Sequence, residues 1–288
     1  MKNILIVGAN GYIGSLLHKT LKLHQYKIFG VDSFLRNYNS QTIDDDIEKI
    51  SYQNLSPKFL DQFTDCIWLA GHSSVQMSSQ DEQGALRNNL YDLINFSNLF
   101  RGRLIYASSG SVYSRDKAEK ADENFATLIP NNIYDYTKIS FDNYIGASKA
   151  KAIALRFGTV NGYSPRMRNE LMINSMVNSS IKNGYLEISN KNKFRSILFI
   201  EDLIAAVLKI IETDVNDGIF NLCSFNASIE EIGETVAQKM NAKIKNKHDS
   251  PTYNFMMDTS KFEKEFNFKF TGDIKKIIDN LYNNIDIN

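Results

Sequence analysis

Short apolar runs that end in glycine or hydroxyl residues recur through the first half of the chain. They include Ile4 to Val7, Lys27 to Val31, Asp65 to Gly71 and Gly102 to Tyr113. Runs of this length with turn residues at their ends are typical of strands covered on both faces in a parallel sheet. Apolar positions at helical spacing follow several of them, so the pattern predicts an α/β fold with a doubly wound parallel sheet.

Helical spacing of apolar residues marks the segments between and after these strands. We expect helices over residues 14–22, 82–99, 133–145, 200–212, 228–240, 259–266 and 273–282, and a further strand over 218–222. The helix that ends near Met240 opens with a capping box, Ser228 to Glu231. Residues 32–64 carry a weaker signal, which predicts a polar loop, a short strand near 47–52 and a helix after Pro57.

Three glycines spaced three residues apart follow the first predicted strand. Gly8, Gly11 and Gly14 fall where a side chain would obstruct a tight turn, the approach of a phosphate, or helix–sheet packing. The second predicted strand ends at Asp32, whose carboxylate can accept both ribose hydroxyls of an adenosine and would repel a 2′-phosphate. These features predict an NAD site rather than an NADP site. The alternative is a glycine turn of another α/β sheet, with Asp32 as a solvated strand end.

Tyr134 and Lys138 lie four residues apart in a predicted helix and therefore share one face of it. A tyrosine hydroxyl, with a pKa of about 10, is a poor base at neutral pH. A nearby lysine ammonium favours the phenolate, and a serine hydroxyl can steer the proton. Ser108 and Ser109 end the strand before this helix, so the glycine turn, the acidic strand end, the serines and the Tyr–Lys pair occur in order.

Composition excludes several classes of partner. The chain has 33 Lys and Arg against 33 Asp and Glu, so no net field attracts nucleic acid or an anionic membrane, and the Lys243 to Lys247 cluster reads as a solvated strand face. The chain starts directly with a strand, and no apolar run reaches membrane-spanning length, so we expect a cytoplasmic protein. Cys66 and Cys223 lie in separate apolar runs, so we expect both to be buried as small hydrophobic side chains. They do not imply a metal site.

The glycine turn, Asp32, the Ser108–Ser109 strand end and the Tyr134-x-x-x-Lys138 spacing together resemble the extended short-chain dehydrogenase/reductases, also called the NAD-dependent epimerase/dehydratase family. The resemblance runs over nearly the whole chain. It implies NAD as the cofactor and Ser109, Tyr134 and Lys138 as the catalytic set.

The resemblance also implies a division of the chain. A Rossmann-type NAD-binding domain with the catalytic helix is expected over residues 1–157. A smaller, mainly substrate-binding α/β region is expected over 158–288, with 197–222 returning to the Rossmann sheet. We expect the protein to form a homodimer.

The expected cofactor contacts come from the glycine turn, the neighbouring strand ends and the helices behind them. They are Gly8, Gly11, Tyr12, Ile13, Gly14, Asp32, Ser33, Leu69, Ala70, Gly71, Asn89, Tyr134 and Lys138. Asn89 is expected to be exposed and to bond a neighbouring loop, and His72 to bond nearby backbone or take part in the chemistry. The expected substrate contacts are Ser109, Arg166, Arg168, Asn174 and Arg195, of which Arg195 matches an arginine that binds the substrate pyrophosphate in relatives.

The sequence departs from relatives at two places. Many of them carry an arginine shortly before the tyrosine that corresponds to Tyr253, and this chain has none there. Family dehydratases place Asp and Glu directly after the catalytic hydroxyl residue, where this chain has Gly110 and Ser111. We therefore expect no sugar 4,6-dehydration. The acids Asp116, Glu119, Asp122 and Glu123 nearby are expected to lie in a solvated loop.

The expected function is oxidation of a sugar hydroxyl, with Tyr134 taking the proton and NAD the hydride. The expected substrate is a nucleoside diphosphate sugar. The sequence leaves open whether the protein is an epimerase or a dehydrogenase or reductase. The alternative from another class is a non-catalytic NAD-binding sensor or interaction protein on the same fold. Such a protein would need the glycine turn but not Ser109, Tyr134 and Lys138.

Overall fold

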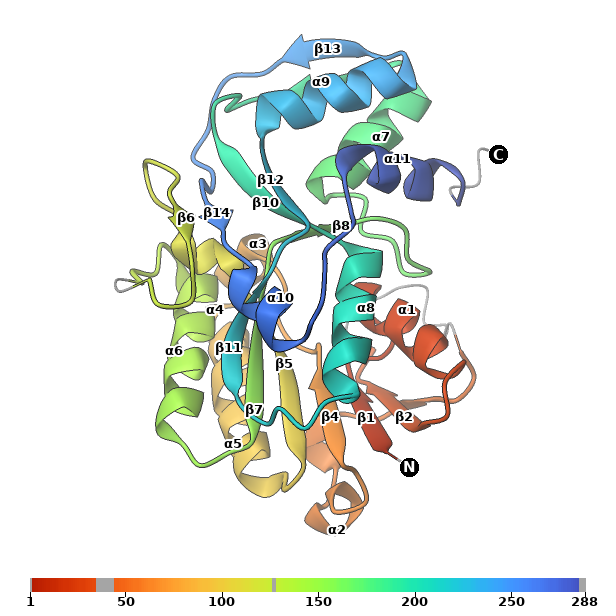
Figure 1. Ribbon diagram of the computed structural model, residues 1–288, viewed down its shortest axis with the longest axis vertical. Coiled ribbons are helices and arrows are strands. Elements are labelled where there is room, and N and C mark those ends of the chain that lie inside the picture. Colours follow the sequence, from red (N-terminus) through yellow and green to blue (C-terminus); the bar gives the residue numbers. More distant parts are fainter. Residues whose placement is uncertain (1, 35–43, 126–127, 285–288) are drawn as a thin grey trace.

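The computed structural model describes residues 2–34, 44–125 and 128–284 (Figure 1). Most of the polar loop predicted after Asp32 lies outside the described residues. A large sheet with helices on both faces forms the lower part of the molecule in Figure 1, and a smaller α/β part lies above it. The smaller part carries the helices α7 (Met172–Asn183), α9 (Ile229–Met240) and α11 (Ile274–Tyr282).

Seven parallel strands form the large sheet, in the order β11-β7-β5-β4-β1-β2-β3. Their bounds are β1 Asn3–Val7, β2 Lys27–Asp32, β3 Ile47–Lys49, β4 Asp65–Trp68, β5 Arg103–Ser109, β7 Ala152–Phe157 and β11 Gly218–Leu222. The strand order reverses beside β1, which is the feature that defines a doubly wound fold. The predicted Rossmann-type parallel sheet is therefore confirmed.

Alternate residues of the central strands face opposite sides of this sheet, because successive side chains of a strand point in opposite directions. Ile4 and Ile6 of β1 pack in one hydrophobic cluster, whereas Leu5 and Val7 pack in the other. Among the helices that contribute to these clusters, α1 Tyr12–Leu21 and α8 Ile200–Ile211 belong to the first, and α5 Asp92–Leu99 and α6 Ile133–Ala147 to the second. The helices thus cover both faces of the sheet, which leaves the ends of the strands as the place for a binding site.

The helix predicted over residues 82–99 is not regular. It consists of α4 (Glu82–Leu86), a π-helical turn η2 (Arg87–Tyr91) and α5. The π turn places Asn89 in the interior, where it is 1% exposed, so the prediction that Asn89 is exposed was wrong. A π turn inserts one extra residue and often lies at a functional site. The short helix α3 (Val75–Gln80) precedes it and was not predicted.

The smaller part is built on a second sheet in the order β12-β10-β8. Its strands are β8 Thr159–Asn161, β10 Phe194–Phe199 and β12 Phe225–Ser228. Residues 197–199 pair in this sheet, so the predicted return of 197–222 to the large sheet begins only after residue 199. Within that segment β11 joins the large sheet beside β7, and α8 packs on the sheet face. The domain boundary predicted at residue 157 stays a prediction.

Short elements complete the fold. They are the strand pairs β9 Tyr185–Ile188 with β13 Lys243–Asn246 and β6 Lys120–Ala121 with β14 Met256–Met257, the helices α2 Pro57–Leu60 and α10 Ser260–Glu265, and the 3₁₀ turns η1 Tyr52–Asn54 and η3 Gly110–Tyr113. The predicted capping box is confirmed, because the Ser228 hydroxyl accepts the Glu231 amide at 3.1 Å. Cys66 and Cys223 are buried free thiols.

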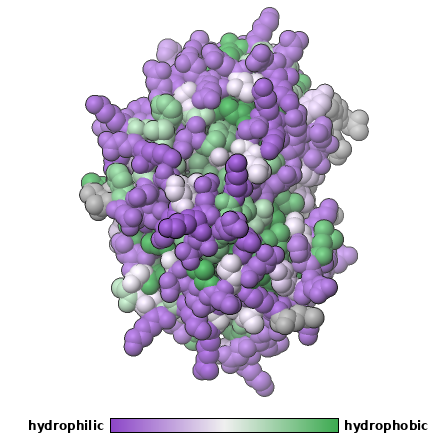
Figure 2. Space-filling model, in the orientation of Figure 1, coloured by the Kyte–Doolittle hydropathy of each residue, from purple (hydrophilic) through white to green (hydrophobic). Residues whose placement is uncertain are grey.

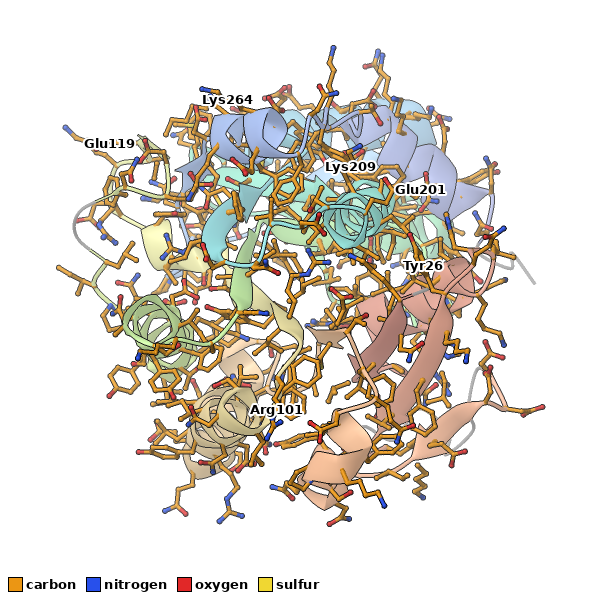
Figure 3. All side chains as sticks on the ribbon, turned by 60° about the horizontal axis from the view of Figure 1, so that its bottom comes forward. Tyr26, Arg101, Glu119, Glu201, Lys209 and Lys264 are labelled. Carbon is orange, nitrogen blue, oxygen red and sulfur yellow. The ribbon has the colours of Figure 1, made fainter. Side chains whose placement is uncertain are left out.

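Many charged side chains lie at the surface. The face in Figure 2 is mainly hydrophilic, and in Figure 3 Glu119 and Lys264 point away from the body of the molecule. Among the described residues, no helix has both the length and the apolar character that a membrane span needs. The predicted homodimer and cytoplasmic location stay predictions.

A buried ion pair fixes α6 to the sheet. The Asp142 carboxylate on α6 accepts from the Arg156 guanidinium of β7 at 2.8 Å and from the Tyr106 hydroxyl of β5 at 2.5 Å. Arg156 also donates to the Tyr113 hydroxyl at 2.5 Å. Asp142 is 1% exposed and Arg156 3%. Because α6 begins at Ile133, this network holds the helix that carries Tyr134 and Lys138.

Replacement of Asp142 by Asn should destabilise the protein. The substitution leaves the Arg156 charge buried without its carboxylate, and breaking a buried pair in this way costs about 3–5 kcal/mol. Urea unfolding followed by circular dichroism measures the free energy of unfolding. The exposed control Glu234→Gln should change it by less than about 0.5 kcal/mol. A loss below about 1 kcal/mol for Asp142→Asn would show that the pair does not fix α6.

Candidate active site

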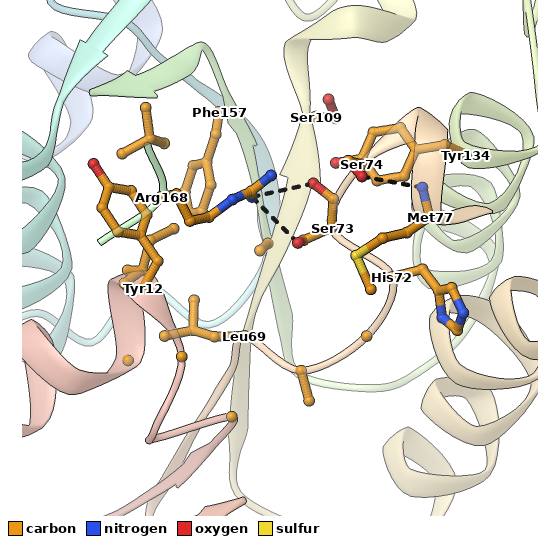
Figure 4. A pocket seen from close by; sticks show the side chains of 18 of the residues that line it. Tyr12, Leu69, His72, Ser73, Ser74, Met77, Ser109, Tyr134, Phe157 and Arg168 are labelled. Carbon is orange, nitrogen blue, oxygen red and sulfur yellow. Dashed lines mark hydrogen bonds between the residues drawn. The ribbon is translucent and has the colours of Figure 1, made fainter. Parts of the chain in front are cut away.

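One large cavity, of about 1030 Å³, opens at the carboxyl edge of the large sheet. The turn after β1, the ends of β2, β4 and β5, the start of α6 and segments of the smaller part line it (Figure 4). It brings together most of the residues predicted from sequence: Gly8, Gly11, Tyr12, Ile13, Gly14, Asp32, Ser33, Leu69, Ala70, Gly71, Ser109, Tyr134, Lys138, Arg168 and Arg195. Asn89, Arg166 and Asn174 do not line the cavity, so their predicted direct contacts are not supported.

The glycine turn has the geometry that close approach of a ligand requires. Gly8 has a φ of +88°, and a Cβ there would lie 2.7 Å from the Ala70 amide nitrogen. A Cβ at Gly14 would lie 2.1 Å from the Gly8 carbonyl, so Gly14 lets α1 pack on the turn. A Cβ at Gly11 would meet only the Gly8 carbonyl, at 3.2 Å. The protein thus leaves space over Gly11, at the start of a helix whose first turn has no side-chain cap.

Asp32 places a carboxylate at the end of β2. Its oxygens accept the backbone N–H of Asn10 at 3.0 Å and of Phe34 at 2.8 Å, which fixes the side chain at the cavity wall. The Arg166 guanidinium donates to the Asn10 side-chain carbonyl at 3.3 Å. Arg166 therefore supports the turn from behind instead of lining the cavity.

Asn89 holds the loop that follows β4. Its amide oxygen accepts the His72 backbone N–H at 2.8 Å, and its amide nitrogen donates to the His72 carbonyl at 3.0 Å. Gly71 has a φ of +125°, and a Cβ there would lie 2.2 Å from the Asn89 amide oxygen. The predicted bond to a neighbouring loop is confirmed. Asn89 does not line the cavity itself but holds in place a loop that does.

The Tyr134 ring projects into the cavity near Ser109 (Figure 4). Burial raises the pKa of Tyr134 and outweighs the hydrogen bond with Ser109 and the charge of Arg168, which lower it. The sequence predicted a pKa lowered by Lys138, and the structure gives the opposite direction. Burial also lowers the pKa of Lys138 to about 8. The Lys138 ammonium donates to the Ala107 carbonyl at 2.7 Å and lies 5.6 Å from the centre of the Tyr134 ring.

A buried carboxyl beside Tyr134 was missed by sequence reasoning. Asp135 is fully buried, and its Oδ1 accepts the Ser111 hydroxyl at 2.6 Å and the Tyr253 hydroxyl at 3.0 Å. Asn132, the N-cap of α6, donates to its Oδ2 at 2.9 Å. Burial raises the pKa of Asp135 although these donors lower it. The signal in the sequence was an acid directly after the tyrosine, which the search for a Tyr–Lys spacing passes over.

Two arginines line the cavity from the smaller part. Arg195 on β10 is 5% exposed and donates to the Thr252 hydroxyl at 2.5 Å. Burial lowers the pKa of Arg195 to about 10, which still leaves it cationic at neutral pH. Arg168 reaches across to the Ser73 hydroxyl at 3.2 Å (Figure 4). Asn174 donates to the Arg168 carbonyl at 3.1 Å, so it supports the loop that carries this arginine.

The acidic loop after η3 is only partly solvated. Asp116, Glu119 and Asp122 are exposed as predicted. Glu123 is half-buried, and its carboxylate accepts the Asn221 backbone N–H at 2.6 Å, so for this residue the prediction was wrong. Burial raises the pKa of Glu123. None of these four acids lines the cavity.

Comparison with known proteins assigns the family. Residues 4–223 match the model of the NAD dependent epimerase/dehydratase family, which is well over half of the chain. This chain therefore belongs to that family. The predicted family is confirmed, and with it NAD as the cofactor on which the family depends.

Similar individual proteins span several activities. The uncharacterized protein MJ1055 of Methanocaldococcus jannaschii is 26% identical over 301 residues, covering 93% of this chain and 91% of the relative. The structure of UDP-glucuronic acid 4-epimerase from Bacillus cereus with UDP-glucuronic acid and NAD gives a TM-score of 0.84 at 22% identity, with 98% of each chain covered. The structure of dTDP-glucose 4,6-dehydratase from Bacillus anthracis with NAD gives a TM-score of 0.80 at 19% identity, with 99% of this chain and 97% of the other chain covered. At these identities the structures establish the fold, which an epimerase and a dehydratase share.

The turn and Asp32 fit a dinucleotide. The open space over Gly11 and the uncapped start of α1 suit a pyrophosphate, and the Asp32 carboxylate suits a ribose diol. Lys138 and Tyr134, near the start of α6, line the same cavity. These residues would hold NAD, as the family assignment requires.

Replacement of Asp32 by Ala should weaken NAD binding by about 10- to 100-fold, since a hydrogen bond to a charged group contributes about 1.5–3 kcal/mol. Binding of NADP should change much less, because the carboxylate repels its 2′-phosphate. Fluorescence of Trp68 can follow the titration, since its ring lies 4.6 Å from that of Tyr52 in the cavity wall. The exposed Asp61→Asn variant is the control. Tighter binding of NADP than of NAD by the unaltered protein would contradict the assignment.

Proposed function

We propose that this protein is an NAD-dependent enzyme that oxidises a hydroxyl of a nucleoside diphosphate sugar to a ketone. The observation that carries the proposal is that Ser109, Tyr134, the glycine turn and two arginines all line one cavity. When bound, NAD supplies the acceptor for the hydride of the sugar carbon. The chain itself must then hold the sugar, exclude water and take the hydroxyl proton.

Tyr134 and Ser109 are the groups for the proton. Both side chains line the same cavity. A substrate hydroxyl between them could donate to one oxygen and accept from the other, which fixes the C–H bond of the same carbon. The Lys138 ammonium donates to the Ala107 carbonyl. In this arrangement Lys138 orients the site and does not contact the reacting hydroxyl.

Arg195 and Arg168 are the groups for the diphosphate. A guanidinium matches two phosphate oxygens with parallel N–H donors, and it keeps its charge when buried. Arg195 is held in place by the Phe194 carbonyl at 2.9 Å as well as by Thr252. The UDP-glucuronic acid bound by the Bacillus cereus epimerase supports a substrate of this class.

We propose further that the reaction does not eliminate water. Elimination needs a carboxyl group at the sugar, and Gly110 offers no side chain. A Cβ there would lie 2.1 Å from the Met257 sulfur, so a larger residue would fit only if the Met257 side chain moved. At position 111 the serine lies between the cavity and the Asp135 carboxyl, which does not line the cavity. Epimerases and dehydrogenases share the oxidation step, and they differ in whether the ketone is reduced again before release.

A panel of UDP-, GDP- and dTDP-linked sugars, incubated with the purified protein and NAD, tests this function by mass spectrometry of the products. We expect a product of unchanged mass for epimerisation, or one that differs by two hydrogens for net oxidation or reduction. Arg195→Leu should raise KM at least about tenfold, whereas the exposed Arg101→Leu should not. Loss of one water would overturn the reaction type. Turnover of a free sugar but of no nucleotide sugar would overturn the substrate class.

A further inference from the structure

A short linking segment, residues 252–255, connects the strand β10 with the turn that follows β5. The Asn254 side-chain oxygen accepts the backbone N–H of Phe194, the first residue of β10, at 2.9 Å. The Asn254 backbone N–H donates in the other direction, to the Ser114 hydroxyl at the end of η3, at 3.0 Å. The segment therefore joins the strand that carries Arg195 to the turn directly behind the end of β5.

The Tyr253 hydroxyl binds the first turn of α6. It donates to Asp135 Oδ1 at 3.0 Å and accepts from the Asn132 side-chain amide at 2.8 Å. A hydroxyl has one hydrogen, and this hydrogen is used inside the protein. Tyr253 also lines the cavity, so it forms part of the wall without offering its hydroxyl hydrogen to a ligand.

Asp135 is bonded from η3, from the linking segment and from the N-cap of α6. Besides the bond from Tyr253, its Oδ1 accepts the Ser111 hydroxyl at 2.6 Å, and its Oδ2 accepts the Asn132 amide at 2.9 Å. Asn132 in turn accepts the Asp135 backbone N–H at 3.0 Å, which closes the first turn of the helix. Asp135 is fully buried. A buried network whose members are bonded in this way is rigid, so the place of Tyr253 relative to α6 is fixed.

Thr252, the residue before Tyr253, holds the Arg195 side chain. The Arg195 guanidinium donates to the Thr252 hydroxyl at 2.5 Å and to the Phe194 carbonyl at 2.9 Å. These two bonds set the plane of the guanidinium. A guanidinium binds two phosphate oxygens at once only when its N–H fork faces them. The place of Thr252 therefore decides how well Arg195 can meet a diphosphate.

We propose that Asp135 and Asn132 are positioning residues for the diphosphate of the substrate. They flank Tyr134 in the sequence, and through Tyr253 and its neighbour they hold the Arg195 guanidinium at a fixed place relative to Tyr134. The reacting hydroxyl and the diphosphate belong to one molecule. Both are bound at once only if the two protein groups keep the spacing that the sugar between them requires. The inference rests on the proposed function.

Binding of a nucleoside diphosphate to the NAD-loaded protein tests this role. The probes are UDP, GDP and dTDP, measured by isothermal titration calorimetry. Tyr253→Phe removes one oxygen and keeps the ring, and we expect it to raise the Kd of the best-bound probe by about 5- to 20-fold. Thr252→Val should do the same. With a sugar nucleotide that is turned over, the loss should appear in KM, with kcat within about threefold of the wild-type value.

A double variant separates positioning from direct contact. If Tyr253 acts through Arg195, its hydroxyl has no further effect once the guanidinium is gone, so Tyr253→Phe combined with Arg195→Leu should bind the probe as weakly as Arg195→Leu alone. Asp135→Asn keeps an oxygen that can accept from Tyr253, so it should bind the probe more tightly than Asp135→Ala. The exposed Tyr282→Phe is the control and should bind the probe like the wild-type protein.

Two results would overturn the positioning role. An unchanged Kd in Tyr253→Phe would show that the linking segment does not hold Arg195. Additive losses from Tyr253→Phe and Arg195→Leu would show that Tyr253 acts on the ligand or on folding by another route.

Nitrogen-15 NMR of the arginine side chains separates this inference from the proposed function, because it needs no nucleotide. The Arg195 resonance is identified by its loss in Arg195→Leu. Exchange of its N–H hydrogens with water should become about tenfold faster in Tyr253→Phe, since the side chain is held less firmly. Exchange at the wild-type rate would contradict the link. If no probe binds but the exchange responds as stated, the proposed substrate class fails and the link between Tyr253 and Arg195 stands.

Discussion

Close backbone packing at the glycine turn sets the position of the whole site. Gly8 lies against the end of β4, and Gly14 lies against Gly8, with no room for a side chain at either place. This contact aligns the ends of β1 and β4, which are paired in register from Ile4 with Asp65 to Val7 with Trp68. Because β5 is paired with β4 in turn, Ser109 comes to the same edge as the turn.

Burial then determines the chemistry of the groups at that edge. Tyr134, Lys138, Asp135 and Arg195 all have pKa values displaced towards the neutral form of the side chain, and burial is the largest cause in each case. Burial therefore makes the charged forms of these side chains costly unless hydrogen bonds stabilise them. Hydrogen bonds to Asp135 and from Arg195 supply this stabilisation, so the groups that make them matter to the site.

The parts of this fold with local signals could be predicted from the sequence. The strand runs, the capping box at Ser228 and the glycine turn depend on neighbours within a few residues. Ser109, Tyr134 and Lys138 could be brought together because parallel strands place their carboxyl ends at one edge. Their environment could not be predicted, since the pKa of Tyr134 depends on how completely the fold buries it.

Features that depend on distant partners were missed. Asn89 is buried because a π turn rotates it towards His72, and the spacing of apolar residues does not reveal that turn. Residues 197–199 pair with β8 and β12, which a local pattern cannot distinguish from pairing in the large sheet. Asp135 has no periodic signal, and its role follows from Ser111, 24 residues earlier, and Tyr253, 118 residues later.

Transfer of the sugar hydroxyl proton by Tyr134 can be measured in a single turnover, by following the absorbance of reduced nicotinamide after a nucleotide sugar is added to the NAD-loaded protein. We expect reduction to slow by about 100-fold or more in Tyr134→Phe, with NAD affinity unchanged. Reduction at a near-normal rate in Tyr134→Phe would contradict this role of Tyr134.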